Sequence, residues 1–268
     1  MTKTKTRSSL TLAILSLLLS PAAVFLSGLP ARSQLASDAL VNEVPAQWGV
    51  DASFQPSGGK PGGREGAATR SPCVLGRAKL TALAPQNELG LTADPYPSFF
   101  AYIPKTRAEK VRFTLETEDG KEVYTSSFDL AKLPGKDIGQ PGIAHLKLPK
   151  NAGFTPLEIG TNYRWRYTLV CDGGATIFAR GWVRRVEPDA DLTKALETAT
   201  LSEQIALYAD ANLWHDTLAA VNELHLQKPR DRSVANVLVK LLKAVELEGI
   251  AEAVQSSQSP WLDCCNES

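Results

Sequence analysis

The spacing of apolar residues changes once along this 268-residue chain, and that change constrains the fold more than any other feature. Between residues 73 and 187 apolar and polar residues alternate, which is typical of strands with one buried face. Beyond Pro188 apolar residues recur with helical spacing. The sequence therefore predicts an α+β protein in which a β-sandwich, residues 73–187, precedes a helical segment, residues 188–255.

Turn signals divide the alternating region into about seven strands, as in an immunoglobulin-like antiparallel sandwich. Asp119-Gly120 and Asp172-Gly173-Gly174 supply turns that tolerate positive φ angles. The expected strands cover residues 80–84, 98–103, 111–115, 123–128, 143–148, 163–171 and 176–186. Tyr163 follows the Leu-x-x-Gly-x-x-Tyr pattern that precedes a tyrosine corner in such sandwiches, with plain core or edge packing as the alternative.

Three helices and a final turn are expected after the sandwich. The helices cover residues 192–210, residues 213–226 and a stretch that Asp231 caps, and the turn covers residues 250–254. The stretch from Ala211 to Pro229 resembles the second helix of a tetratricopeptide hairpin. Because stacking needs about three such repeats and one is visible, we expect a small tetratricopeptide-like hairpin packed on the sandwich.

The first 33 residues predict a secretory signal peptide. A cationic start precedes an apolar run from Leu10 to Leu19 and a small-x-small cleavage site at residues 31–33. The run of about ten residues is short for a membrane span, which needs about 20, so an uncleaved anchor helix is the weaker alternative. We expect an exported protein, periplasmic or extracellular, that meets the membrane only through this leader before cleavage.

Residues 34–72 and 256–268 are expected to flank the folded part as a flexible arm and a tail. Glycine and proline concentrate between residues 56 and 66 of the arm, and such a stretch has a high entropy cost of ordering. A phosphate-binding loop is the alternative for these glycines. It is disfavoured because no strand-like segment precedes them and no helix with Lys-Ser or Lys-Thr follows.

The charge balance argues against nucleic acid as a partner. The whole chain has 29 basic and 29 acidic residues. Since the leader holds four basic residues and no acid, the mature chain has an acidic excess of about four charges. A surface for nucleic acid or anionic lipid needs a basic excess instead.

Four cysteines, Cys73, Cys171, Cys264 and Cys265, fit an exported chain with disulfides. Sequence alone leaves three pairings open. We favour Cys73–Cys171, which closes a loop of about 100 residues and stabilises by about 4 kcal/mol in the chain-entropy model. Cys264 and Cys265 then form a strained ring, pair with another chain or stay as thiols. Metal-ligand spacing is absent, so we expect no metal and no cofactor.

Several separate blocks give the chain a family resemblance. They are residues 66–73, 80–85, 89–92, 97–104, 163–167, 169–172, 181–183 and 213–218. With these blocks the chain resembles a cyanobacterial exported family known only as domain of unknown function 928, over about residues 66–255. The resemblance implies a cyanobacterial origin and an exported location. It implies no reaction and no catalytic residues.

No catalytic pattern stands out in the sequence. His145, His215 and His225 lack metal-ligand spacing, and there is no Gly-x-Ser-x-Gly motif for a serine nucleophile. Acidic residues at 116–119 border an expected turn, and those at 189–191 lack the rest of a calcium loop. We therefore expect no enzyme, with an exported hydrolase of dispersed catalytic residues as an alternative.

The strand at residues 98–103 is aromatic on both sides. With a period of two, Phe100 and Tyr102 lie opposite Phe99, so one of the two sets must meet solvent, a ligand or the helical segment. Trp182 raises the same question. We expect the helices to cover these rings, and an aromatic binding patch is the alternative.

Four arginines are expected on one sheet face. Arg164, Arg166, Arg180 and Arg184 occupy polar positions of two strands, near Trp182. Guanidinium groups beside an aromatic ring suit an acidic glycan or an acidic protein surface.

The sequence thus predicts an exported cell-envelope protein of unknown activity, a non-enzymatic binding or scaffolding module for an envelope protein or glycan. A structural envelope or matrix component, crosslinked through the tail cysteines, is the other alternative besides the hydrolase.

Overall fold

The computed structural model describes residues 63–66, 73–85, 89–130, 141–150, 153, 155–257 and 261–262. The predicted signal peptide, most of the predicted arm, and Cys264 and Cys265 lie outside the described residues. The predictions for them therefore stay predictions. None of the helices in the described ranges is long and apolar enough to cross a membrane.

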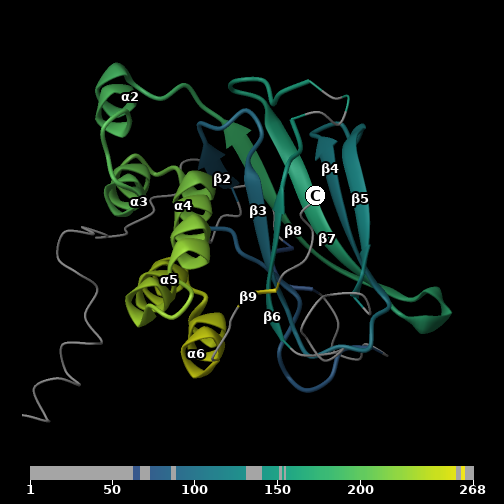
Figure 1. The fold of residues 1–268 in the computed structure, drawn as a ribbon. Coiled ribbons are helices and arrows are strands. Elements are labelled where there is room, and N and C mark those ends of the chain that lie inside the picture. Colours follow the sequence, from purple (N-terminus) through teal and green to yellow (C-terminus); the bar gives the residue numbers. More distant parts are fainter. Residues whose placement is uncertain are drawn as a thin grey trace, which may run out of the picture.

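The described chain is an α+β protein with two mixed β-sheets and five helices in three layers (Figure 1). The sheets have the strand orders β1-β3-β6-β9 and β2-β8-β7-β4-β5. The four-stranded sheet consists of β1 (Thr81–Ala82), β3 (Ser98–Ile103), β6 (Gly142–Lys147) and β9 (Trp261–Leu262). The five-stranded sheet consists of β2 (Leu89–Thr92), β4 (Lys110–Thr117), β5 (Glu122–Asp129), β7 (Asn162–Val170) and β8 (Thr176–Arg185).

The seven strands expected from the alternation are present, but the prediction of an antiparallel sandwich is wrong for two further strands. β2 runs parallel to β8, and β9 runs parallel to β6. Both are short edge strands without a clear alternation, so the pattern does not reveal them. Strand β9 also corrects the predicted tail, residues 256–268, because Trp261 and Leu262 are buried.

Aromatic rings fill the space between the two sheets. Phe99, Phe113 and Trp165 point inward from β3, β4 and β7 and are fully buried. The Phe99 ring centroid lies 5.0 Å from that of Phe113 and 5.3 Å from that of Trp165, so these tilted rings join the sheets. Gly181 on β8 leaves room for Trp165, because a Cβ atom there would lie 2.7 Å from the indole ring.

Five helices follow the sandwich in the described chain, and Thr200 separates the first two. They are α2 (Ala190–Leu196), α3 (Leu201–Asp210), α4 (Trp214–Gln227), α5 (Arg232–Ala244) and α6 (Glu248–Ser256). The sequence predicted one helix over residues 192–210. That prediction is wrong because Thr200 and Glu203 form a reciprocal capping box, which starts a new helix. The tetratricopeptide-like character of the hairpins is not confirmed.

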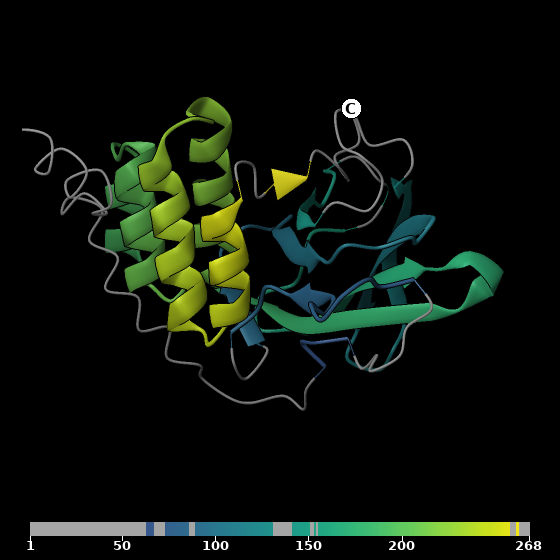
Figure 2. The ribbon, with the colours of Figure 1, turned by 90° about the horizontal axis from the view of Figure 1, so that it is seen from below.

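Helices α4, α5 and α6 cover the outer face of the four-stranded sheet (Figures 1 and 2). Phe100 and Tyr102 point to this side and are buried against the helical residues, in one cluster with Trp214 and Val254. The expectation that helices cover the second aromatic face of β3 is confirmed. The outer face of the five-stranded sheet lies on the opposite side of the molecule, away from the helices (Figure 1).

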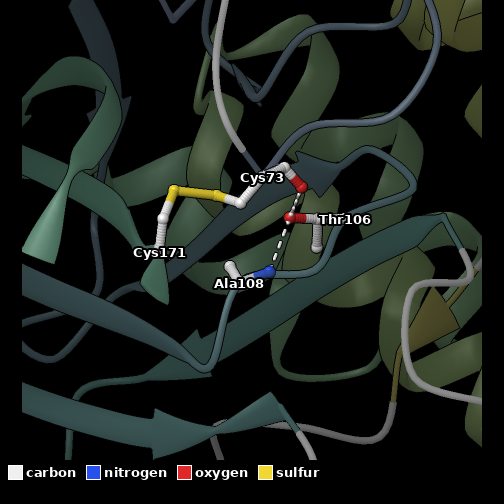
Figure 3. Close-up of a disulfide and its surroundings, with 4 residues drawn as sticks. All are labelled: Cys73, Thr106, Ala108 and Cys171. Atoms are coloured by element: carbon white, nitrogen blue, oxygen red, sulfur yellow. Dashed lines mark hydrogen bonds between the residues drawn. A yellow bond between two sulfur atoms is a disulfide. The ribbon is translucent and has the colours of Figure 1, made fainter. Parts of the chain in front are cut away.

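A disulfide joins Cys73 to Cys171, the pairing that the sequence favours (Figure 3). The two Cα atoms are 5.6 Å apart and the residues are separated by 98 positions in the chain. The Cys73 carbonyl accepts a 2.7 Å hydrogen bond from the Thr106 hydroxyl, which itself accepts one from the Ala108 N–H at 3.0 Å. These bonds fix the segment at residue 73 to the end of β7 and to the loop before β4.

Tyr163 makes the hydrogen bond that defines a tyrosine corner. Its hydroxyl accepts from the backbone N–H of Glu158, five residues upstream, at 3.1 Å. The Tyr163 ring is buried in the sandwich core. The bond therefore holds the segment before β7 against the ring that β7 buries.

Four residues of the predicted flexible arm, residues 63–66, lie against the folded part. The Arg180 N–H of β8 donates to the Gly63 carbonyl at 2.9 Å. The Arg64 guanidinium donates to the carbonyls of Val245 at 2.7 Å and Glu246 at 3.0 Å. The prediction of flexibility is wrong for these four residues. They pair with neighbouring strands, and the Arg64 guanidinium binds carbonyl groups at the C-terminal end of α5, where the helix dipole is negative.

Candidate binding face

The binding residues predicted from the sequence come together on the outer face of the five-stranded sheet. The opposed pairs on β7 and β8 are Arg164 and Trp182, Arg166 and Arg180, and Asn162 and Arg184. Directly opposed residues of antiparallel strands share a face. Because the neighbouring residues Tyr163 and Trp165 point into the core, the four arginines and Trp182 occupy the face that the helices leave open.

Glu116 on β4 neutralises two of these arginines. Its Oε2 accepts from Arg164 Nη2 at 2.5 Å, and its Oε1 accepts from Arg166 Nη2 at 3.0 Å. The Glu116 side chain is only 15% exposed, so these charge-assisted bonds are partly shielded from water and hold both guanidinium groups on the sheet. Arg184 Nε in turn donates to Asn162 Oδ1 at 2.8 Å. The predicted cationic band is therefore wrong at its centre, where an ion-pair network lies instead.

Trp182 and Arg180 are also engaged in contacts within the chain. Trp182 is 8% exposed and lies under Arg164, whose Cζ is 5.9 Å from the indole centroid. A Cβ atom at Gly63 would lie 2.5 Å from Arg180 Nε, so the segment at residue 63 packs directly on the Arg180 side chain. Trp182 is thus too buried to serve as a stacking platform, and a ligand on this face meets other side chains.

A groove of about 570 Å³ lies on the same face beside the ion-pair network. Short hydroxyl-bearing side chains line it, namely Thr114, Thr125, Ser127, Thr168 and Thr176. Longer side chains line it as well, namely Arg112, Glu122, Arg166 and Phe178. The sheet is hollow here because short side chains from neighbouring strands stand between long ones.

Arg112 and Phe178 are two groove residues that the sequence patterns did not single out. Phe178 is 43% exposed, with Arg166 Cζ 5.8 Å from its ring centroid. Arg112 forms no ion pair with any described residue, and its Nε donates a 3.4 Å hydrogen bond to Ser127 Oγ. The alternation in β8 could have identified Phe178. Ile177 points into the core, so the next residue, Phe178, points to the outer face of the sheet.

A second polar cluster is buried between α4 and the sheets. The His215 Nδ1–H donates to the Ser98 carbonyl at 2.9 Å. Ser98 Oγ lies 3.0 Å from His145 Nε2, and His145 Nδ1 lies 3.3 Å from Asn222 Nδ2. Burial lowers the pKa of both histidines to about 4, so both are neutral at pH 7.

This cluster contains a serine and a histidine in contact, but it lacks the features of a nucleophilic site. Ser98 is 3% exposed. With the Asn222 amide donating to Nδ1, the His145 proton sits on Nε2 and is donated to Ser98, the reverse of what a general base requires. Asp216 accepts from the Ala93 N–H at 3.1 Å, and burial raises its pKa to about 6. Among the described residues, no three His, Cys, Asp or Glu side chains gather to hold a metal ion.

Two solved structures are distantly similar to this chain. The fn3 domain of the human collagen alpha-1(XX) chain is 16% identical with a TM-score of 0.22, and the match covers 50% of this chain and 93% of that domain. A structure described as pT26-6p is 16% identical with a TM-score of 0.21, covering 62% of this chain and 33% of that one. At these TM-scores neither similarity establishes a shared fold. No curated protein matches the chain.

A protein-family comparison gives a clear result. The profile of a family described as Domain of Unknown Function (DUF928) matches residues 65–255. The matched range contains the disulfide, the groove on the five-stranded sheet and the helical layer into α6. It also agrees with the range over which the sequence blocks resemble that family. This protein therefore belongs to the DUF928 family.

Proposed function

We propose that this protein is an exported, non-enzymatic binding module of the cell envelope, and that it holds an acidic glycan in the groove on the five-stranded sheet. The predicted signal peptide supports export. The Cys73–Cys171 disulfide supports export as well, because disulfides persist in oxidising compartments.

The groove offers three kinds of contact for an acidic sugar chain. The Arg112 guanidinium has no acidic partner among the described residues, and its planar fork of donors matches the two oxygens of a carboxylate. Phe178 presents an exposed ring to the apolar face of a sugar. The serine and threonine hydroxyls both donate to and accept from sugar hydroxyl groups.

The main support for the proposal is the difference between the outer faces of the two sheets. The helices cover the outer face of the four-stranded sheet (Figure 2). The outer face of the five-stranded sheet carries a polar groove instead. On that face Glu116 pairs with Arg164 and Arg166 but not with Arg112. We therefore place the acidic group of the ligand at Arg112.

Calorimetric titration of the mature protein with polygalacturonate tests the proposal. We expect polygalacturonate to bind and dextran, which is uncharged, to give no binding. Arg112→Gln and Phe178→Ala should each weaken binding about fivefold to tenfold, because each removes a contact of about 1–1.5 kcal/mol. Arg107→Gln, an exposed arginine outside the groove, is the matched control and should leave the affinity unchanged.

Three results would count against this function. Equal binding of dextran would show that recognition does not depend on the charge of the glycan. Wild-type affinity in both groove variants would show that the glycan does not bind in the groove. Preference for polyglutamate over polygalacturonate would replace the glycan with an acidic protein partner.

A further inference from the structure

A cleft lies where helix α6 meets the four-stranded sheet, and it shares no lining residue with the groove on the five-stranded sheet. It consists of two hollows, of about 260 Å³ and 330 Å³. Tyr102 of β3 and Ala253 of α6 line both of them, so we treat the two hollows as one junction cleft. Ligand sites occur preferentially at borders between packed units of this kind.

The Tyr102 hydroxyl is the polar group that marks the junction cleft as a site. Tyr102 is 5% exposed, and its side chain packs among helical residues. No described residue forms a hydrogen bond with its hydroxyl, whereas the hydroxyls of Tyr163 and Tyr167 each bond to the backbone. Burial raises the pKa of Tyr102, so the phenol keeps its proton and both donates and accepts. The Tyr102 hydroxyl oxygen is not among the fully buried polar atoms, so it is open to the cleft, where a ligand can form a hydrogen bond with it.

Charged groups of both signs line the larger hollow. Arg77 forms no ion pair with a described residue, in contrast to Lys79, which pairs with Glu65 at 2.6 Å. Glu248, the first residue of α6, is exposed and also forms no ion pair within the described chain. Arg77 therefore suits a carboxylate, and Glu248 suits an ammonium group.

Apolar side chains line much of the smaller hollow. Pro141, which directly precedes β6, and Ala253 and Val254 of α6 supply them. Removing an apolar side chain from water into such a hollow is favourable. A ligand that meets the whole cleft thus has one apolar side chain, one carboxylate and one ammonium group.

We propose that the junction cleft binds a short zwitterionic peptide with an apolar side chain. The peptide carboxylate pairs with Arg77 and its ammonium group pairs with Glu248. A peptide carbonyl accepts a hydrogen bond from Tyr102, and the apolar side chain enters the smaller hollow. A simple fatty acid leaves Glu248 without a partner, and a simple amine leaves Arg77 without one. This site is independent of the proposed glycan site.

Calorimetric titration of the mature protein with leucyl-leucine and its two blocked forms tests the proposal. We expect leucyl-leucine to bind, and N-acetyl-leucyl-leucine and leucyl-leucinamide to bind about tenfold more weakly, since each loses one charge-assisted contact. Tyr102→Phe should weaken binding of all three about fivefold and keep the ring packing. Arg77→Gln should abolish the preference for the free carboxylate, and Glu248→Gln the preference for the free ammonium group.

Matched controls separate this site from the groove. Arg107→Gln and Arg112→Gln should bind leucyl-leucine like the wild type. The proposal is overturned if leucyl-leucine fails to bind at millimolar concentration or if the blocked peptides bind as tightly. It is also overturned if Tyr102→Phe binds like the wild type while circular dichroism shows an unchanged fold.

Discussion

At the scale of single residues, two tyrosines differ in what their hydroxyl groups contact. Tyr163 and Tyr102 are 6% and 5% exposed. The Tyr163 hydroxyl accepts from the Glu158 N–H at 3.1 Å, whereas the Tyr102 hydroxyl bonds to no described residue. The two side chains therefore have equal burial but different contributions to folding, and Tyr102 keeps its hydrogen-bonding capacity for a ligand.

Removing each hydroxyl separates the two roles. Tyr163→Phe should lower the free energy of unfolding by about 1 kcal/mol, because the Glu158 N–H loses its partner. Tyr102→Phe should change it by less than about 0.5 kcal/mol. Urea unfolding followed by tryptophan fluorescence measures both values. An equal loss in the two variants would mean that Tyr102 has a structural partner, and the argument for the junction cleft would fail.

At the scale of elements, helix α4 is the part of the helical layer that reaches both sheets. The His215 ring centroid lies 5.2 Å from that of Phe99 on β3 and 6.0 Å from that of Trp165 on β7. Trp214 Nε1 donates to the Leu83 carbonyl at 2.8 Å. The start of α4 therefore enters the side of the sandwich, where Trp214 Nε1 and His215 Nδ1 are buried and each donates to a backbone carbonyl.

Lowering the pH from 7 to 5 should destabilise the packing of α4 against the sheets. His145 and His215 have a pKa of about 4 when folded, against an ordinary value of 6.5. Between these values the unfolded chain binds more protons, so each histidine costs about 1–2 kcal/mol of stability from pH 7 to pH 5. Asp216 acts in the opposite direction, because its folded pKa of about 6 exceeds the ordinary 3.8 and the folded state gains a proton. The free energy of unfolding should fall by about 2 kcal/mol in total.

Two variants test these opposing contributions. His145→Gln should reduce the fall between pH 7 and pH 5 by about 1–2 kcal/mol, and Asp216→Asn should enlarge it by about 1 kcal/mol. Urea unfolding at the two pH values measures the difference. A His145→Gln protein with the pH dependence of the wild type would contradict a neutral, partly buried His145.

The elements that the sequence predicts are those whose pattern is local. Alternation over nine or ten residues reveals strands such as β7 and β8, and the Asp119-Gly120 turn joins β4 to β5 as expected. Strands β2 and β9 have four and two residues and form by pairing with β8 and β6, which are distant in the chain. No local signal encodes such pairing, so the parallel pairs escaped prediction.

At the scale of the whole molecule, three layers give the two sheets different surroundings. The helices bury one face of the four-stranded sheet, and the Arg64 contacts with the end of α5 tie residues 63–66 to that layer. The helices leave the outer face of the five-stranded sheet open (Figure 2), and the groove lies on this face. The sequence predicted which arginines share this face, because that follows from alternation on β7 and β8. It did not predict that Glu116 of another strand neutralises two of them, because this depends on strand register.

Hydroxyl-radical footprinting with mass spectrometry, with and without polygalacturonate, tests most directly whether the open sheet face is the binding face. Phe178 is 43% exposed and Phe100 is 1% exposed, so the first should be oxidised in the unbound protein and the second should not. Polygalacturonate should protect Phe178 and leave the Phe100 signal unchanged. Oxidation of Phe100 in the unbound protein, or full oxidation of Phe178 while the polysaccharide is bound, would contradict this account.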